Sequence, residues 1–212
     1  MAMLPSELRE QWPQLEMRLQ TADILLFHKR QGPITRMIQR ETESYWNHAA
    51  LVFTPKGDLP MGGPLIVEAT YGGIEIHQMK KYTDYFDDYD VGVLRYPGMK
   101  DALRQRLVMN FILNNIDISY DYSRLVGLFL RPLIALSPAL YEWMLHRLIH
   151  QQNFVCSTFV HQAFRDFRKR GTVAGSARTA GPGLDPVPYE EMITPGHLVF
   201  EPHFRWVFNE RV

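Results

Sequence analysis

Short apolar runs of strand length recur through the first half of this 212-residue chain. Five of them are predicted as β-strands: 22–27, 48–53, 65–70, 74–79 and 91–96. Gly- and Pro-rich clusters lie between the second and third runs, and Gly72-Gly73 precedes the fourth. Strands so closely joined by turn residues predict an antiparallel meander.

Helical periodicity marks other parts of the chain. A polar helix is expected over 5–19 and a short one over 34–40. A longer helix is expected over 101–115. Its apolar stripe is formed by Leu103, Leu107, Phe111 and Asn114, with Val108 and Ile112 beside it.

A further helical pattern begins at Cys156, and its apolar positions follow the spacing i, i+3, i+4, i+7, i+8 and i+11. These positions are Cys156, Phe159, Val160, Ala163, Phe164 and Phe167. The pattern predicts a helix over 153–169 that turns this face toward the core. The fold class expected from the elements together is α+β, with the antiparallel meander packed against the cysteine-bearing helix.

Two segments do not fit this arrangement of strands and amphipathic helices. The stretch 125–149 is strongly apolar but contains Arg131, two prolines and Glu142, so it predicts an apolar helical insertion over 120–150. The leading interpretation is two short helices in a buried or substrate-covering insertion. An interfacial, lipid-facing segment is the main alternative, and a membrane span is the third. The stretch 170–192 is rich in Gly, Pro, Ala and Ser and predicts a flexible loop. Residues 1–212 are therefore expected to form one domain, with the strand region at 22–96.

The composition limits the classes of molecule that this chain is expected to bind. Lys plus Arg and Asp plus Glu both number 23, so the formal net charge is zero, and no basic excess points to nucleic acid. The N-terminal residues lack the apolar core of a Sec signal peptide. A cytoplasmic location is the expectation. Peripheral membrane contact through 125–149 and export without such a signal are the alternatives, and the oligomeric state is left open.

Three chemically active side chains lie on three different predicted elements. His48 begins one strand, Glu68 lies within the next, and Cys156 begins a helix. A thiol, an imidazole and a carboxylate are the components of a cysteine hydrolase or acyltransferase. With Ala50 opposite Ile66 in an antiparallel pair, His48 would lie directly opposite Glu68 and could be oriented by it.

The predicted position of Cys156 favours ionisation. The N-terminus of a helix presents unpaired N–H groups and the positive end of the helix dipole, and both stabilise a thiolate. A competing interpretation makes Cys156 an inert core cysteine, His48 a satisfied core histidine and Glu68 a charge at a strand edge. His146 and His150 have helical i, i+4 spacing but no accompanying ligand motif, so no metal or cofactor is expected.

The order of these motifs is similar to that of a known family. "WNHAALVF", "IVEAT" and "FVCSTFV" place His, Glu and Cys in the order of the circularly permuted NlpC-like branch of the papain-like superfamily. Lecithin:retinol acyltransferase-like proteins are relatives of that branch. "ADILLF" resembles the family's "GDIIF" strand with Ala22 in place of Gly, "ISYDYS" resembles a "YDY" segment, and "ITPGHLVF" resembles a "TPxDL" element with His197 in place of the acid.

The resemblance implies a circularly permuted papain-like (NlpC-type) fold with Cys156 as nucleophile, His48 as general base and acid, and Glu68 as the orienting third member. Tyr120 and Asp121 are expected near the substrate. Tyr45 and Asn47 are added as candidates because they precede His48 closely in the sequence.

The expected activity is cysteine-dependent hydrolysis of an amide bond through a thioester, by a peptidase or amidase, with cell-wall-type peptides as one candidate substrate class. A lipid-directed acyltransferase, thioesterase or phospholipase is the alternative favoured by the apolar segment 125–149, because an acyl chain needs an apolar groove. A non-catalytic binding module is the second alternative. The expected partner is a peptide- or lipid-like small substrate, without nucleic acid or cofactor.

Overall fold

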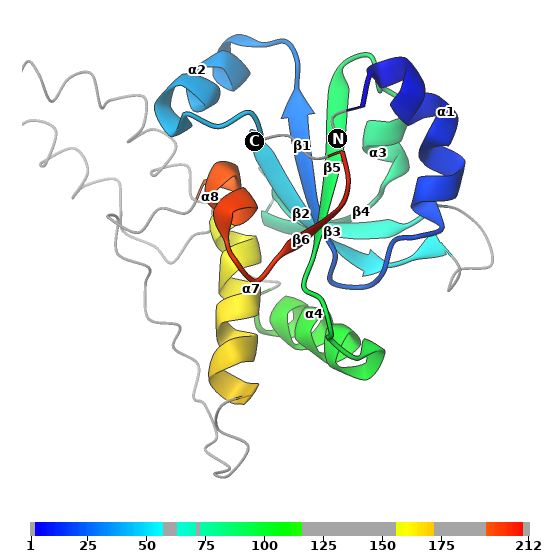
Figure 1. Ribbon diagram of the computed structural model, residues 1–212. Helices are drawn as coiled ribbons and strands as arrows, with labels where there is room; N and C mark the ends of the chain where they lie inside the picture. Colours follow the sequence, from blue (N-terminus) through cyan, green and yellow to red (C-terminus); the bar gives the residue numbers. More distant parts are fainter. Residues whose placement is uncertain (1–2, 57–62, 71–72, 116–155, 172–193, 210–212) are drawn as a thin grey trace, which may run out of the picture.

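The computed structural model describes residues 3–56, 63–70, 73–115, 156–171 and 194–209, and these form an α+β fold around one six-stranded antiparallel sheet (Figure 1). The strand order is β4-β3-β2-β1-β5-β6. The strands are β1 (Ile24–Lys29), β2 (His48–Thr54), β3 (Leu65–Thr70), β4 (Gly73–Gln78), β5 (Tyr89–Arg95) and β6 (Arg205–Phe208). The helices are α1 (Pro5–Glu16), α2 (Pro33–Thr42), α3 (Lys80–Thr83), α4 (Asp101–Asn115), α7 (Cys156–Gly171) and α8 (Pro195–Phe200).

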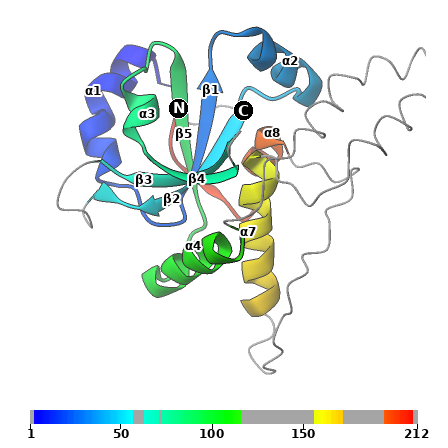
Figure 2. The same ribbon diagram turned by 180° about the vertical axis from the view of Figure 1, so that it is seen from behind.

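Alternation along the strands divides the buried side chains between two cores, one on each face of the sheet. Leu25 and Phe27 of β1 pack with α1 and α3, whereas Ile24 and Leu26 pack with α4, α7 and α8. Figures 1 and 2 show these two sets of helices on opposite sides of the sheet. The α-helix that carries the cysteine therefore covers one face, and α3 covers the other.

The predicted strands and main helices are confirmed within the described residues. The meander β2-β3-β4 is antiparallel throughout, and α4 has the predicted bounds. Three elements were not predicted: α3, α8 and β6, which pairs with β5 through Leu94 and Trp206. They are four to six residues long, too short to show a hydrophobic period.

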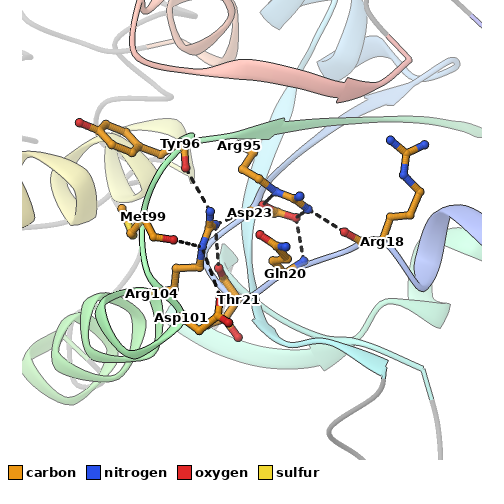
Figure 3. A network of polar contacts seen from close by, with 9 residues as sticks. All are labelled: Arg18, Gln20, Thr21, Asp23, Arg95, Tyr96, Met99, Asp101 and Arg104. Atoms are coloured by element: carbon orange, nitrogen blue, oxygen red, sulfur yellow. Dashed lines mark hydrogen bonds and ion pairs between the residues drawn. The ribbon is translucent and has the colours of Figure 1, made fainter.

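One detail of the predicted stripe on α4 is wrong. Leu103 is 39% exposed, and its neighbour Arg104 is buried instead, beside Leu107 and Val108. Arg104 points inward because its guanidinium finds buried acceptors there. It donates to the backbone carbonyls of Met99 at 2.9 Å and Tyr96 at 3.1 Å (Figure 3). A charged residue can thus replace an apolar one in a helical stripe when its donors are satisfied.

The apolar insertion predicted over 120–150 and the loop predicted over 170–192 lie outside the described residues, as does the single-domain arrangement that includes them. Within the described part of the chain, none of the helices combines the length and apolar character needed to cross a membrane.

Candidate active site

His48 and Glu68 meet on the face of the sheet that α1 and α3 cover, but in a register different from the predicted one. Ala50 pairs with Glu68 and Val52 with Ile66, two residues away from the predicted pairing. A shift of two keeps every side chain on its original face. His48 therefore reaches Glu68 diagonally across the strands, and His48 Nε2 donates to Glu68 Oε2 at 2.5 Å.

Glu68 is a fully buried carboxylate with three hydrogen-bond donors. Besides His48, the hydroxyl of Tyr82 donates to Oε2 at 2.5 Å, and Lys81 Nζ donates to Oε1 at 2.7 Å. Burial would raise the pKa of Glu68, but His48, Lys81 and Tyr82 together lower it to about 2. Glu68 therefore remains ionised throughout the physiological range.

Cys156 approaches from the opposite face of the sheet. It is the first described residue of α7, whose following residues Phe159 and Val160 pack in the core shared with α4 and α8. The described β2-β3 ladder starts at the Ala50–Glu68 pair, and the backbone N–H of Ala49, just before it, donates to the Cys156 sulfur. The thiol thus reaches His48 at the end of the β2-β3 ladder.

The imidazole of His48 links the thiol to the carboxylate. A hydrogen bond joins Cys156 to His48, and because Nε2 is bonded to Glu68, Nδ1 is the ring nitrogen that faces the sulfur. Phe27 stacks against the ring at a centroid distance of 5.8 Å and limits its rotation. The three groups form one connected chain of hydrogen bonds.

The two partners change each other's ionisation. Burial alone would lower the pKa of His48, but the charge and hydrogen bond of Cys156, followed by those of Glu68, raise it to about 10. Burial would likewise raise the pKa of Cys156, but His48 and the N–H groups of Ala49 and Ser157 lower it below that of an ordinary thiol. The arrangement favours a thiolate–imidazolium pair at neutral pH.

The predicted substrate contacts are placed as follows. The hydroxyl of Tyr45 donates to Asp90, and its ring stacks on His28 at a centroid distance of 4.0 Å. The amide of Asn47 accepts from the backbone N–H of Lys29 at 3.2 Å, so it caps the end of β1. A substrate-binding role for Tyr45 and Asn47 stays a prediction, and Tyr120 and Asp121 lie outside the described residues.

Lys81 and Tyr82 are the site residues that the sequence analysis missed. They lie in α3, directly after the edge strand β4, in the segment "MKKYTDYF". Nothing in that segment marks a site, since two lysines and a tyrosine after a strand are ordinary surface residues. The positions could have been found only from the correct register of β3 and the path of the chain after β4.

The chain was compared with known proteins. No protein-family model matches it, and neither does any curated protein sequence. Among solved structures it is similar to the crystal structure of the metalloprotein yiiX from Escherichia coli O157:H7, with a TM-score of 0.55 and 18% sequence identity. The similarity covers 90% of this chain and 97% of that one. At this identity the likeness concerns the fold alone, and it agrees with the α+β architecture described above.

Proposed function

We propose that this protein is a cysteine-dependent hydrolase of amide bonds, built on a circularly permuted papain-like (NlpC-type) fold. In this proposal Cys156 is the nucleophile, His48 the general base and acid, and Glu68 the orienting third member. One observation carries it: the thiol that begins α7 is hydrogen-bonded to a histidine whose other ring nitrogen lies 2.5 Å from a buried carboxylate. That is the arrangement of an activated cysteine nucleophile.

Acylation begins with attack of the Cys156 thiolate on the carbonyl carbon of the substrate. The new C–S bond moves the carbonyl electron pair onto oxygen, and the positive end of α7 stabilises this negative charge. When the pair returns, the C–N bond breaks and the His48 imidazolium gives its proton to the departing amine. A thioester on Cys156 and a neutral His48 remain.

Deacylation restores the starting state. Neutral His48 takes a proton from water while the water oxygen attacks the thioester carbonyl, and the C–S bond breaks to release a carboxylic acid and the Cys156 thiolate. Glu68 keeps Nε2 as the donor and stabilises the imidazolium in both half-reactions. An amide needs a protonated leaving group, so a histidine that stays positively charged at neutral pH suits this substrate class.

The permuted arrangement is supported by the chain order of the three residues. His48 on β2 and Glu68 on β3 precede Cys156 on α7, whereas in ordinary papain-like enzymes the cysteine helix comes first. The antiparallel meander packed against the cysteine helix agrees with the same family.

We propose no metal-dependent step, although the structural neighbour is described as a metalloprotein. Both oxygens of Glu68 already accept hydrogen bonds, one of them from the ammonium of Lys81, whose charge opposes a cation. Among the residues that the structure describes, no group of three or more His, Cys, Asp or Glu side chains could hold a metal ion. The donor set around Cys156 therefore suits proton transfer rather than metal ligation.

Lipid-directed acyl transfer is the second candidate. The same thioester could be released by an alcohol or an amine in place of water, and the apolar segment 125–149 would suit an acyl chain. A non-catalytic binding module with this fold would instead bind substrate without forming a covalent intermediate.

One experiment separates these functions. The protein is incubated with a panel of peptide amides and a panel of phospholipid and acyl-thioester substrates, and both products and intact protein mass are recorded, with Cys156→Ala as control. We expect hydrolysis of an amide and a transient mass increase equal to the acyl group, both absent from Cys156→Ala. Acyl adducts from lipids alone would favour the second candidate, and equal turnover by Cys156→Ala would end the nucleophile assignment.

A further inference from the structure

The short helix α3 supplies two further hydrogen-bond donors to the carboxylate of Glu68. Tyr82 shares Glu68 Oε2 with His48, and Lys81 Nζ binds the other oxygen, Oε1, at 2.7 Å. Both oxygens are thus fixed in direction, and the carboxylate cannot rotate away from His48 without losing a bond to α3.

Tyr82 is held in place independently of Glu68. Its side chain is buried, its ring stacks on Phe27 at 3.8 Å between centroids, and the ring of Tyr89 meets it edge-on at 5.2 Å. Phe27 in turn stacks against His48. Because these ring contacts fix the hydroxyl, it acts as a preplaced donor rather than a side chain that follows Glu68.

Lys81 balances the charge of the site. The ionised form of the triad contains two negative groups, Cys156 and Glu68, and one positive group, His48. Lys81 supplies the second positive charge, so the four side chains together are neutral. Without it, a largely buried group would carry a net negative charge, which favours binding of a proton.

Within the described residues, the strand β4 places two further titratable groups near Glu68. His77 Nε2 lies 3.7 Å from Glu68 Oε1 and 3.0 Å from Glu75 Oε2. Glu75 is also bound by the hydroxyl of Thr70. His77 and Glu75 are both partly exposed, and His77 lies closer to Glu75 than to Glu68. Lys81, at 2.7 Å, is therefore the nearer of the two basic partners of Glu68 Oε1.

We propose that Lys81 and Tyr82 are positioning residues of the catalytic triad, which keep Glu68 and Cys156 ionised at the same time around a single imidazolium. This inference rests on the proposed function. Lys81 provides the compensating charge and Tyr82 the fixed direction, and neither touches the reacting atoms.

Loss of either donor should let a proton bind to the site at higher pH. Once Glu68 is protonated it no longer stabilises the imidazolium, and the thiolate of Cys156 is lost with it. The acid limb of the pH dependence of thiol reactivity should therefore move upward. We expect a shift of about one pH unit for Lys81→Met or Tyr82→Phe and about two for the double variant.

The test is the rate of Cys156 alkylation by iodoacetamide between about pH 3 and pH 9, measured by intact mass on the full chain. Cys156 is the sole cysteine, so each modification reports this site. Lys80→Met removes a neighbouring lysine that pairs with Asp84, and Tyr89→Phe removes a hydroxyl from the ring beside Tyr82; both controls should keep the wild-type profile. Lys81→Arg should restore most of the acid limb, because it returns the positive charge.

A purely structural role for α3 would give a different result. Lower thermal stability with an unmoved acid limb in folded Lys81→Met and Tyr82→Phe would overturn the inference while leaving the triad intact. Lys81 is 43% exposed and Tyr82→Phe preserves the ring, so at least one of the two variants should fold. A wild-type thiol that is unreactive on the acid side would contradict the proposed function itself, and the inference with it.

Discussion

Asp23 and Glu68 are both fully buried carboxylates with basic partners, and their pKa values shift in opposite directions. Arg95 donates two hydrogen bonds to Asp23, from Nε to Oδ1 at 2.7 Å and from Nη2 to Oδ2 at 2.6 Å (Figure 3). Burial still raises its pKa, although Arg95 and the N–H of Gln20 act in the opposite direction. Glu68, bound by His48, Lys81 and Tyr82, has its pKa lowered to about 2.

The two clusters also differ in what they can do chemically, because only the Glu68 cluster contains a histidine that can exchange a proton near neutral pH. An arginine remains charged at every accessible pH, so the Asp23 cluster can only join β1, β5 and α4. A histidine changes its charge near neutrality, and in the Glu68 cluster that histidine also faces a thiol. A buried carboxylate therefore indicates chemistry only when one of its donors can titrate.

The largest effect should come from the nucleophile. Cys156→Ala should lower amide hydrolysis by at least about 10³-fold, because no thioester can form. The thermal unfolding midpoint should stay near that of the wild type, since the substitution removes one sulfur atom at the start of α7. Initial rates and circular dichroism melts measure the two quantities.

A variant of the Asp23 cluster should lose stability but keep the reactivity of the thiol. Arg95→Met leaves Asp23 buried without its main partner and should cost about 3–5 kcal/mol in the free energy of unfolding. The pH dependence of Cys156 alkylation should be unchanged wherever the variant is folded. Urea unfolding and alkylation rates provide the measurements, and a shifted alkylation profile would show that the two clusters are coupled.

Glu68→Gln should affect both properties moderately. Activity should fall about 10²-fold, less than in Cys156→Ala, because the imidazolium loses its stabilising charge while the thiol remains. The lowered pKa of Glu68 means that its contribution to stability is present above pH 4.5 and is lost as the pH falls toward 2. It is worth about 3 kcal/mol, so Glu68→Gln should show a weaker loss of stability with acid than wild type in unfolding titrations.

The smallest effect concerns Ala22, beside Asp23. Its backbone is left-handed, with φ of 67°, a conformation that favours glycine. Ala22→Gly should relieve about 1 kcal/mol of strain and lose a similar amount from the buried methyl group. A change in unfolding free energy larger than about 1 kcal/mol in either direction would show that one of these two contributions dominates.

The sequence could predict the strands and the cysteine helix because each has a clear hydrophobic period. It could also place His48 and Glu68 on one face, since alternation survives any shift by an even number of residues. It could not predict the register, because the offset of Ala50 against Glu68 and the one-residue β-bulge between Val52 and Thr54 are not marked by any periodic pattern.

Lys81, Tyr82 and Arg104 could not be predicted from the sequence for a different reason. Lys81 and Tyr82 lie in a four-residue helix without periodicity, and their role depends on where that helix meets Glu68 in space. Arg104 was missed because the acceptors that bind it are backbone carbonyls of Met99 and Tyr96, outside its own helix. The local sequence pattern locates helices and strands, whereas the hydrogen-bond partners of a buried polar side chain depend on tertiary contacts.

The central claim is that Cys156 and His48 form a thiolate–imidazolium pair, and iodoacetamide alkylation across about pH 5 to 9 tests it most directly. Wild type and His48→Ala are compared by intact mass. Rapid single modification of wild type at the acidic end, lost in His48→Ala, is the predicted result. Modification of wild type only at high pH, or only after unfolding, would show that Cys156 is an ordinary core cysteine and contradict the claim.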